Sequence, residues 1–181
     1  MSDYAAFLRG INLGRQRRVG SADLRVCFEG LGFRDVSTFR TSGNVVFTAG
    51  RESRSKLVER LEESLENSLG YEVRVFLRTA DEIREIAEQQ PFPRTAVDGS
   101  KGKLQVAMLS ALPSARLRKE VMSLATDDDR LAFGDCELYW LPSGGTRQSA
   151  LDSRSIEKLL GPWTMRTKGT VEALSAKYFA G

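Results

Sequence analysis

Apolar and polar residues follow two different periods along this chain, and the changes of period predict an ordered series of strands and helices. The apolar run Tyr4–Leu8 has the length and composition of a buried strand. Apolar residues then recur at helical spacing between residues 24 and 31, where Gly32 is placed to end a helix. The chain therefore begins with a strand, a connection of about eleven residues and an amphipathic helix.

The same patterning predicts two halves with the same succession of elements. In the first half we expect further strands at 36–41, 44–48 and 73–77, and helices at 57–69 and from 79 to about 90. In the second half we expect strands at 104–109, 130–133, 136–141 and 163–166, and helices at 113–125, 156–160 and 171–178. Ser42-Gly43 and Gly134-Asp135 are predicted hairpin turns.

This order predicts an α+β fold, a tandem duplication of ferredoxin-like (βαββαβ) plaits, each followed by an extra helix. We expect an N-terminal plait at 1–90 and a C-terminal plait at 101–181. Residues 91–100 are a linker, because prolines and glycines gather around this segment. A predicted helix follows both Arg78-Thr79 and Arg166-Thr167. In each helix the first two large apolar residues lie four and seven positions after the threonine, which supports duplication. Chance likeness of two plain α+β patterns is the alternative.

The composition restricts the chemistry. The chain has no histidine, which excludes histidine general bases, Ser-His and Cys-His nucleophiles, and zinc sites with imidazole. Two cysteines are too few for a disulfide framework, and we expect packed thiols. No apolar run is long enough for a membrane span and no signal peptide is recognised, so we expect a cytoplasmic protein without membrane association. No metal site is predicted, and no cofactor or oligomeric state is identified.

A basic, glycine-containing loop at residues 9–18 is the predicted binding site. It holds four arginines and no carboxylate, in a chain of formal charge +3, and it connects a strand to a helix. Such a connection suits an anion near a helix N-terminus. We expect a pocket for an anionic small molecule or nucleotide-like ligand, formed by Arg9, Gly10, Asn12, Gly14, Arg15, Arg17, Arg40, Thr41, Ser42, Gly43 and Asn44.

Side-chain alternation adds detail to this prediction. Tyr4, Ala6 and Leu8 share the strand face that helices are expected to cover, which leaves Arg9 on the open face. We therefore expect Arg9 to be essential for the anion and Arg18 to matter little.

Other interpretations stay open. The arginines could bind nucleic-acid phosphate weakly and without sequence preference, or the loop could be a solvated turn. The loop is neither a Walker A motif nor a G-x-G-x-x-G fingerprint, and the third strand lacks the aromatic pattern of RNA-recognition motifs. A histidine-free enzyme of unknown reaction is a further alternative. We expect Asp127–Asp129 to be a solvated turn, and Arg147, Arg166 and Lys168 to be isolated surface cations.

Three segments resemble a bacterial family known as domain of unknown function 1697. They are the opening Tyr4–Gly14, the stretch from Leu31–Val36 to Thr41–Phe47, and Ser155–Gly161 with Thr164–Arg166 and Thr170-Val171. The resemblance covers essentially the whole chain and implies tandem ferredoxin-like plaits, but no reaction. Family members usually have a second glycine and lysines after Gly14, and an Arg-Asn-Trp tripeptide where this chain has Arg166-Thr167-Lys168.

Overall fold

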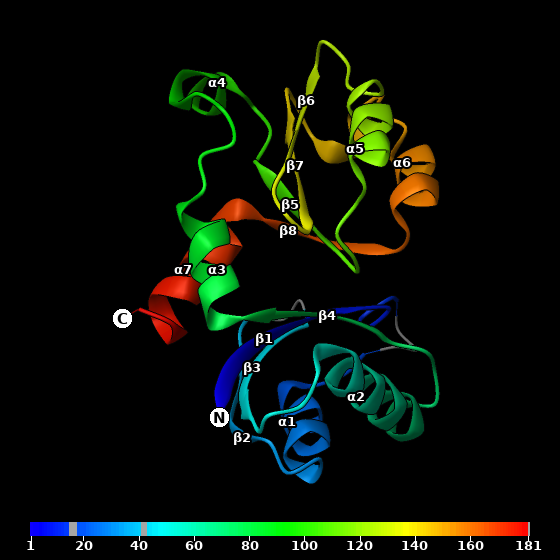
Figure 1. The fold of residues 1–181 in the computed structure, drawn as a ribbon, viewed down its shortest axis with the longest axis vertical. Helices are drawn as coiled ribbons and strands as arrows, with labels where there is room; N and C mark the ends of the chain where they lie inside the picture. The colour runs from blue at the N-terminus through cyan, green and yellow to red at the C-terminus, as the bar shows by residue number, and fades with distance from the viewer. Residues whose placement is uncertain (15–17, 41–42, 181) are drawn as a thin grey trace. The chain divides into compact units, whose positions relative to one another are not determined.

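The computed structural model describes residues 1–14, 18–40 and 43–180, and it has a mixed α+β architecture. Two four-stranded antiparallel sheets and seven α-helices make up the described part of the chain (Figure 1). The chain divides into two compact units, the first formed by residues 1–84 with 174–181, the second by residues 85–173. This confirms the expected α+β class.

The first unit contains one sheet with strand order β2-β3-β1-β4. Its elements are β1 (Ser2–Arg9), α1 (Ser21–Gly30), β2 (Arg34–Thr38), β3 (Asn44–Ala49), α2 (Arg54–Leu69), β4 (Arg74–Thr79) and the first half of α3 (Ala80–Glu88). β1 is central and pairs antiparallel with β3 and β4, with Tyr4 opposite Phe47 and Thr79. The last turn of the C-terminal helix α7 (Lys168–Tyr178) also belongs to this unit.

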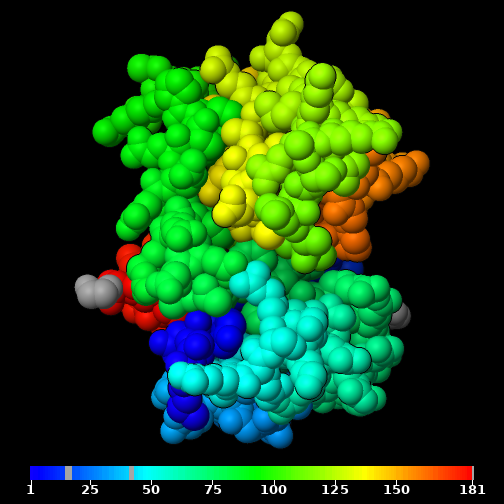
Figure 2. Space-filling view, in the orientation of Figure 1, coloured from blue at the N-terminus to red at the C-terminus, as the bar shows by residue number. Residues whose placement is uncertain are grey.

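Helices α1 and α2 cover one face of the first sheet (Figure 1). The core between them contains Tyr4, Ala6 and Leu8 from β1, as side-chain alternation predicted. Phe28 of α1 and Phe47 of β3 meet edge to face there, with 5.2 Å between ring centres. Helices α2 and α5 (Ala115–Met122) reach the surface of their units (Figure 2). Their exposed residues are mostly charged, which is the amphipathic pattern from which both helices were expected.

β2 is shorter and begins earlier than predicted, at 34–38 instead of 36–41. The register shifts between Arg34 and Ser37, where Asp35 has a φ of 53°, so a bulge interrupts the expected alternation. Arg40 has a φ of 57°, a left-handed conformation that a strand cannot continue through. The antiparallel pairing of β2 with β3 confirms the predicted hairpin.

The second unit repeats the strand arrangement with the order β6-β7-β5-β8. Its elements are the second half of α3, α4 (Arg94–Gly99), β5 (Gln105–Leu109), α5, β6 (Asp129–Phe133), β7 (Glu137–Pro142), the 3₁₀ turn η1 (Thr146–Gln148), α6 (Ser153–Leu160), β8 (Trp163–Thr167) and the first half of α7. Helix α4 lies within the segment expected to be a linker. Trp140 of β7, Val121 of α5 and Ile156 of α6 share the core of this unit.

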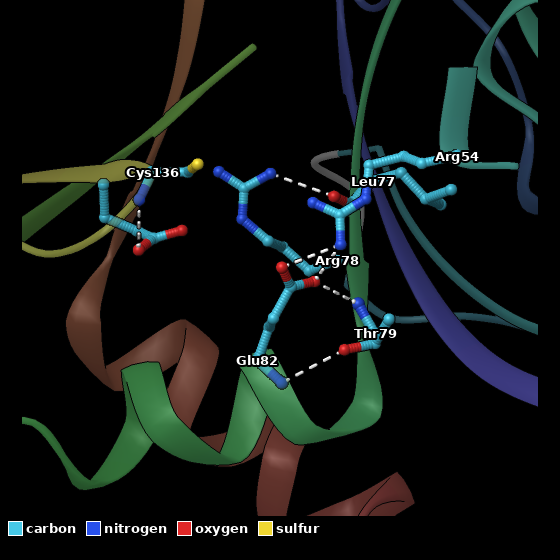
Figure 3. Close-up of polar contacts among 7 residues, drawn as sticks. Arg54, Leu77, Arg78, Thr79, Glu82 and Cys136 are labelled. Carbon is cyan, nitrogen blue, oxygen red and sulfur yellow. Dashed lines mark hydrogen bonds and ion pairs between the residues drawn. The ribbon is translucent and has the colours of Figure 1, made fainter. Parts of the chain in front are cut away.

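The entry into α3 shows how local sequence fixes an element (Figure 3). The Glu82 carboxylate accepts a hydrogen bond from the Thr79 backbone N–H at 2.8 Å, and the Glu82 N–H donates to the Thr79 hydroxyl at 3.2 Å. This is the capping box predicted for this helix start. Arg54 donates to both Glu82 oxygens at 2.7 Å and so ties the start of α2 to the start of α3.

Candidate functional site

A pocket of about 540 Å³ lies in the first unit, between the end of β1, the start of α1 and the β2–β3 connection. The residues that line it come from three segments far apart in sequence: Asn12, Arg18, Val19, Gly20, Ser21, Leu24, Thr38, Arg40, Gly43 and Asn44. Its volume falls within the usual range of small-molecule sites, about 300–1,000 Å³.

The β1–α1 loop is shaped by residues with positive φ. Gly10 has a φ of 97°, and a Cβ there would lie 3.1 Å from the Glu72 carbonyl oxygen, so a side chain is excluded. Asn12 has a φ of 56°, and its side-chain oxygen accepts a hydrogen bond from the Val19 backbone N–H at 3.0 Å. That bond closes the loop on itself and brings Arg18 and Val19 to the start of α1.

The β2–β3 connection forms the opposite wall. Arg40 and Gly43 both have left-handed backbones, with φ values of 57° and 69°. A Cβ on Gly43 would lie 2.6 Å from Ile11 Cδ1 and 3.2 Å from Leu8 Cβ, so only glycine fits against the loop. The Leu8 backbone N–H also donates to the Gly43 carbonyl at 2.8 Å. These contacts fix the connection against the end of β1.

Asn44 forms the floor of the pocket and is 1 % exposed. Its side-chain amide donates to the Phe39 carbonyl at 2.9 Å, and its own carbonyl accepts from the Phe39 N–H at 2.9 Å. Asn44 is thus bonded to Phe39 through both its side chain and its backbone.

The charges around the pocket favour an anion. Arg18 and Arg40 are the two ionisable residues among the described lining residues, and none of these is acidic. Gly20 caps α1 without a side-chain hydrogen bond, so the first-turn amides point outward with the positive end of the helix dipole. The carboxylate of Asp23 lies nearby and accepts from the Gly20 N–H at 3.2 Å. The pocket can hold a negative group by charge and by N–H donors.

General acid–base chemistry has little support in this pocket. Among its described lining residues, hydroxyls come from Ser21 and Thr38, and neither a carboxylate nor a thiol is present to activate them. In the part of the chain that the structure describes, no group of three acidic or cysteine residues could hold a metal ion.

The structure brings together part of the predicted site. Asn12, Arg40, Gly43 and Asn44 line the pocket, whereas Arg9, Gly10 and Gly14 do not. The predicted residues Arg15, Arg17, Thr41 and Ser42 lie outside the described part of the chain.

Arg18 lines the pocket although we expected it to matter little, and Arg9 is absent from the lining for a geometric reason. Arg9 shares its strand face with Ala5 and Phe7, while the pocket opens on the α1 side with Leu24. Thr38 was also missed, whereas a helix N-terminus beside the loop was expected from the strand-to-helix connection.

The second unit corrects two expectations about its polar residues. Asp129 is 1 % exposed and is not part of a solvated turn. Its carboxylate accepts hydrogen bonds from Trp140 Nε1 at 2.7 Å, Ser149 Oγ at 2.7 Å and Thr126 Oγ1 at 2.8 Å. These bonds hold the long β7–α6 connection against the sheet.

The expectation that Arg166 and Lys168 are surface cations is also wrong. Desolvation lowers the pKa of the Arg166 guanidinium to about 10. Its Nη1 donates to the Met165 carbonyl at 2.8 Å and to Thr164 Oγ1 at 3.0 Å. The buried Lys168 amine donates to the Ala87 carbonyl at 2.7 Å and pairs with Glu172 at 2.8 Å. Both are therefore structural cations of the second unit.

Within the described residues, no helix combines the length and the apolar character needed to cross a bilayer.

Comparison with known proteins gives a family and a fold. No curated protein matches the chain. A solved structure, that of the conserved bacterial protein SP0830 from Streptococcus pneumoniae, is similar to it with a TM-score of 0.72 and 24 % identity, covering 97 % of each chain. That likeness shows the fold. The family model described as "Protein of unknown function (DUF1697)" matches residues 1–139, and the chain belongs to this family.

Proposed function

We propose that this protein binds an anionic small molecule, nucleotide-like ligands included, in the pocket between β1, α1 and the β2–β3 connection. One observation carries the proposal: Arg18, Arg40 and the uncapped start of α1 converge on a cavity of about 540 Å³ whose described lining has no carboxylate. Two positive charges beside one cavity attract an anion and stabilise it by charge.

Backbone strain supports the same site. Asn12 and Arg40 are two of the three non-glycine residues with positive φ in the described chain, and both line the pocket. Each such conformation costs on the order of 1–3 kcal/mol and persists where surrounding contacts over-determine it. Strained residues concentrate at ligand sites, where they fix groups before the ligand arrives.

Thermal-shift measurement against a panel of anionic metabolites tests the proposal. A ligand at about 100 times its Kd stabilises the folded protein by roughly 2.7 kcal/mol. Loss of either arginine should weaken binding about tenfold, because hydrogen bonds to charged groups contribute roughly 1.5–3 kcal/mol. We therefore expect Arg18→Ala and Arg40→Ala each to lose about half of the shift at the same ligand concentration.

Two further variants sharpen this test. Lys56→Ala removes one positive charge from the start of α2. This end of α2 lies near Thr79, because Arg54 binds Glu82, which also bonds to Thr79. Thr79 pairs with Tyr4 near the start of β1, whereas the pocket lies beyond the end of β1, so this variant should respond like wild type. Arg9→Ala should also keep the response, and if it alone abolishes the shift, the ligand binds elsewhere.

We also infer a cytoplasmic location and a duplicated fold. Cys27 and Cys136 are half-buried and neither forms a disulfide, which suits a reducing compartment.

Duplication into two ferredoxin-like plaits is supported by the equivalent strand orders β2-β3-β1-β4 and β6-β7-β5-β8. Arg78 and Arg166 add to this, since each donates to the carbonyl of the residue before it, at 2.9 and 2.8 Å. An experimental structure in which residues 1–90 and 101–181 fail to superpose would refute the duplication.

A further inference from the structure

An aromatic and cationic cluster adjoins the proposed anion pocket in the first unit. We call it the Phe39 cluster, and it consists of Phe39, Arg40, Lys177 and Tyr178. Phe39 lies between two residues that line the pocket, Thr38 and Arg40. The Tyr178 ring meets the Phe39 ring at 88°, with 6.0 Å between centres, and its hydroxyl lies 3.5 Å from the Thr38 carbonyl. The last turn of α7 is therefore packed against the wall of the pocket.

Two cations are held over the same aromatic ring in this cluster. The Arg40 guanidinium carbon lies 5.2 Å from the centre of the Phe39 ring, and Lys177 Nζ lies 5.9 Å from it. Lys177 Nζ is also 5.1 Å from the centre of the Tyr178 ring. Cation–π attraction acts at these distances and restricts where both charges can lie. Both charges therefore lie within 6 Å of one ring centre, one from the pocket lining and one from the last turn of α7.

The surroundings of Lys177 leave its charge available to a ligand. Lys177 is exposed and forms no ion pair with any residue in the described ranges. Lys177 lies in the last turn of α7, where the negative end of the helix dipole stabilises a positive charge. The helix dipole does not explain why Arg40 also lies over the Phe39 ring, because two positive charges repel each other. A negative group that contacts both Arg40 and Lys177 would offset this repulsion.

We propose that the ligand carries a chain of at least two linked phosphoryl groups, as in a di- or triphosphate. This rests on the proposed anion pocket. One phosphoryl group binds in the pocket between Arg18 and Arg40, and the next extends past Arg40 to Lys177. Lys177 is outside the described pocket lining, so we assign it to a phosphoryl group beyond the one held by Arg18 and Arg40. Each phosphoryl group of such a chain carries oxygens that accept charge-assisted hydrogen bonds from arginine or lysine.

The test measures the affinity of the full chain for inorganic phosphate, pyrophosphate and tripolyphosphate by titration calorimetry at one fixed ionic strength. Wild type should bind tripolyphosphate clearly more tightly than phosphate. Lys177→Ala should weaken tripolyphosphate binding roughly fivefold, the upper size of a partly exposed ion pair, and leave phosphate affinity unchanged. Lys56→Ala, with the same loss of charge, should match wild type for all three probes.

The outcomes separate this inference from the pocket itself. If no probe binds wild type, or if Arg40→Ala leaves every affinity unchanged, the proposed anion pocket is refuted. If phosphate binds at Arg18 and Arg40 but Lys177→Ala weakens all three probes equally or none, the pocket stands and the phosphate-chain inference fails. A single-stranded oligonucleotide is a fourth probe. If it alone binds in a Lys177-dependent way, the partner is nucleic acid and the inference is overturned.

Discussion

Replacing Gly43 by alanine tests whether the two loops of the pocket are locked together by close packing. Two costs follow from the structure. The backbone φ of 69° disfavours any residue with a Cβ, which costs roughly 1–2 kcal/mol. The new Cβ would also lie 2.6 Å from Ile11 Cδ1 and 3.2 Å from Leu8 Cβ, and such overpacking costs roughly 1–3 kcal/mol. We therefore expect Gly43→Ala to destabilise the protein by about 2–5 kcal/mol.

Gly14→Ala is the matched control. Gly14 has a φ of 71°, but a Cβ there would meet nothing within 4 Å, so this variant incurs the backbone cost alone. Thermal and urea unfolding, followed by circular dichroism, compare the two variants with wild type. A change of 1 kcal/mol moves Tm by about 2–4 °C in a chain of this size, so Gly43→Ala should lower Tm by roughly 4–20 °C.

A second substitution isolates the packing part of the effect. Ile11→Val removes Cδ1, the atom nearest the new methyl group, and should recover about 1 kcal/mol in the Gly43→Ala background. The reasoning is refuted if Gly43→Ala is no more destabilising than Gly14→Ala, or if Ile11→Val adds its own cost to Gly43→Ala without any recovery.

Three further predictions concern other contacts. Asp129→Asn places an amide among three hydrogen-bond donors and should destabilise the protein by roughly 2–3 kcal/mol in urea unfolding, whereas the exposed Asp128→Asn should be near neutral. Burial would raise the pKa of Glu82, but its hydrogen bonds with Arg54 and Thr79 outweigh this and lower it from 4.5. Stability from Glu82 is therefore present above pH 4.5 and lost below it, and Glu82→Gln should flatten this acid limb of the pH–stability curve. Any binding to double-stranded DNA should be sequence-independent, with log K falling by about 3–4 per decade of salt for four arginines, and salt-insensitive binding would contradict this.

The sequence by itself determined the order of the elements and the direction of their apolar faces. Tyr4, Ala6 and Leu8 pack under the helices because alternation along a strand is a local property. The Thr79–Glu82 capping box also formed as predicted, since it needs residues only three positions apart. Asn12, Gly43 and Asn44 were predicted because glycine and asparagine are typical of turns, and Arg40 because it was expected at the end of a strand; all four line the pocket.

Only the tertiary structure decided which cations serve the pocket and which are buried. The path of the β1–α1 loop, set by the Asn12–Val19 hydrogen bond, brings Arg18 to the pocket and leaves Arg9 outside its lining. Lys177 and Tyr178 meet Phe39 across almost 140 residues, and no local pattern encodes that contact. Periodicity fixes what neighbouring residues do, whereas the partners of a charged side chain depend on how distant segments pack, and that packing is settled by the whole fold.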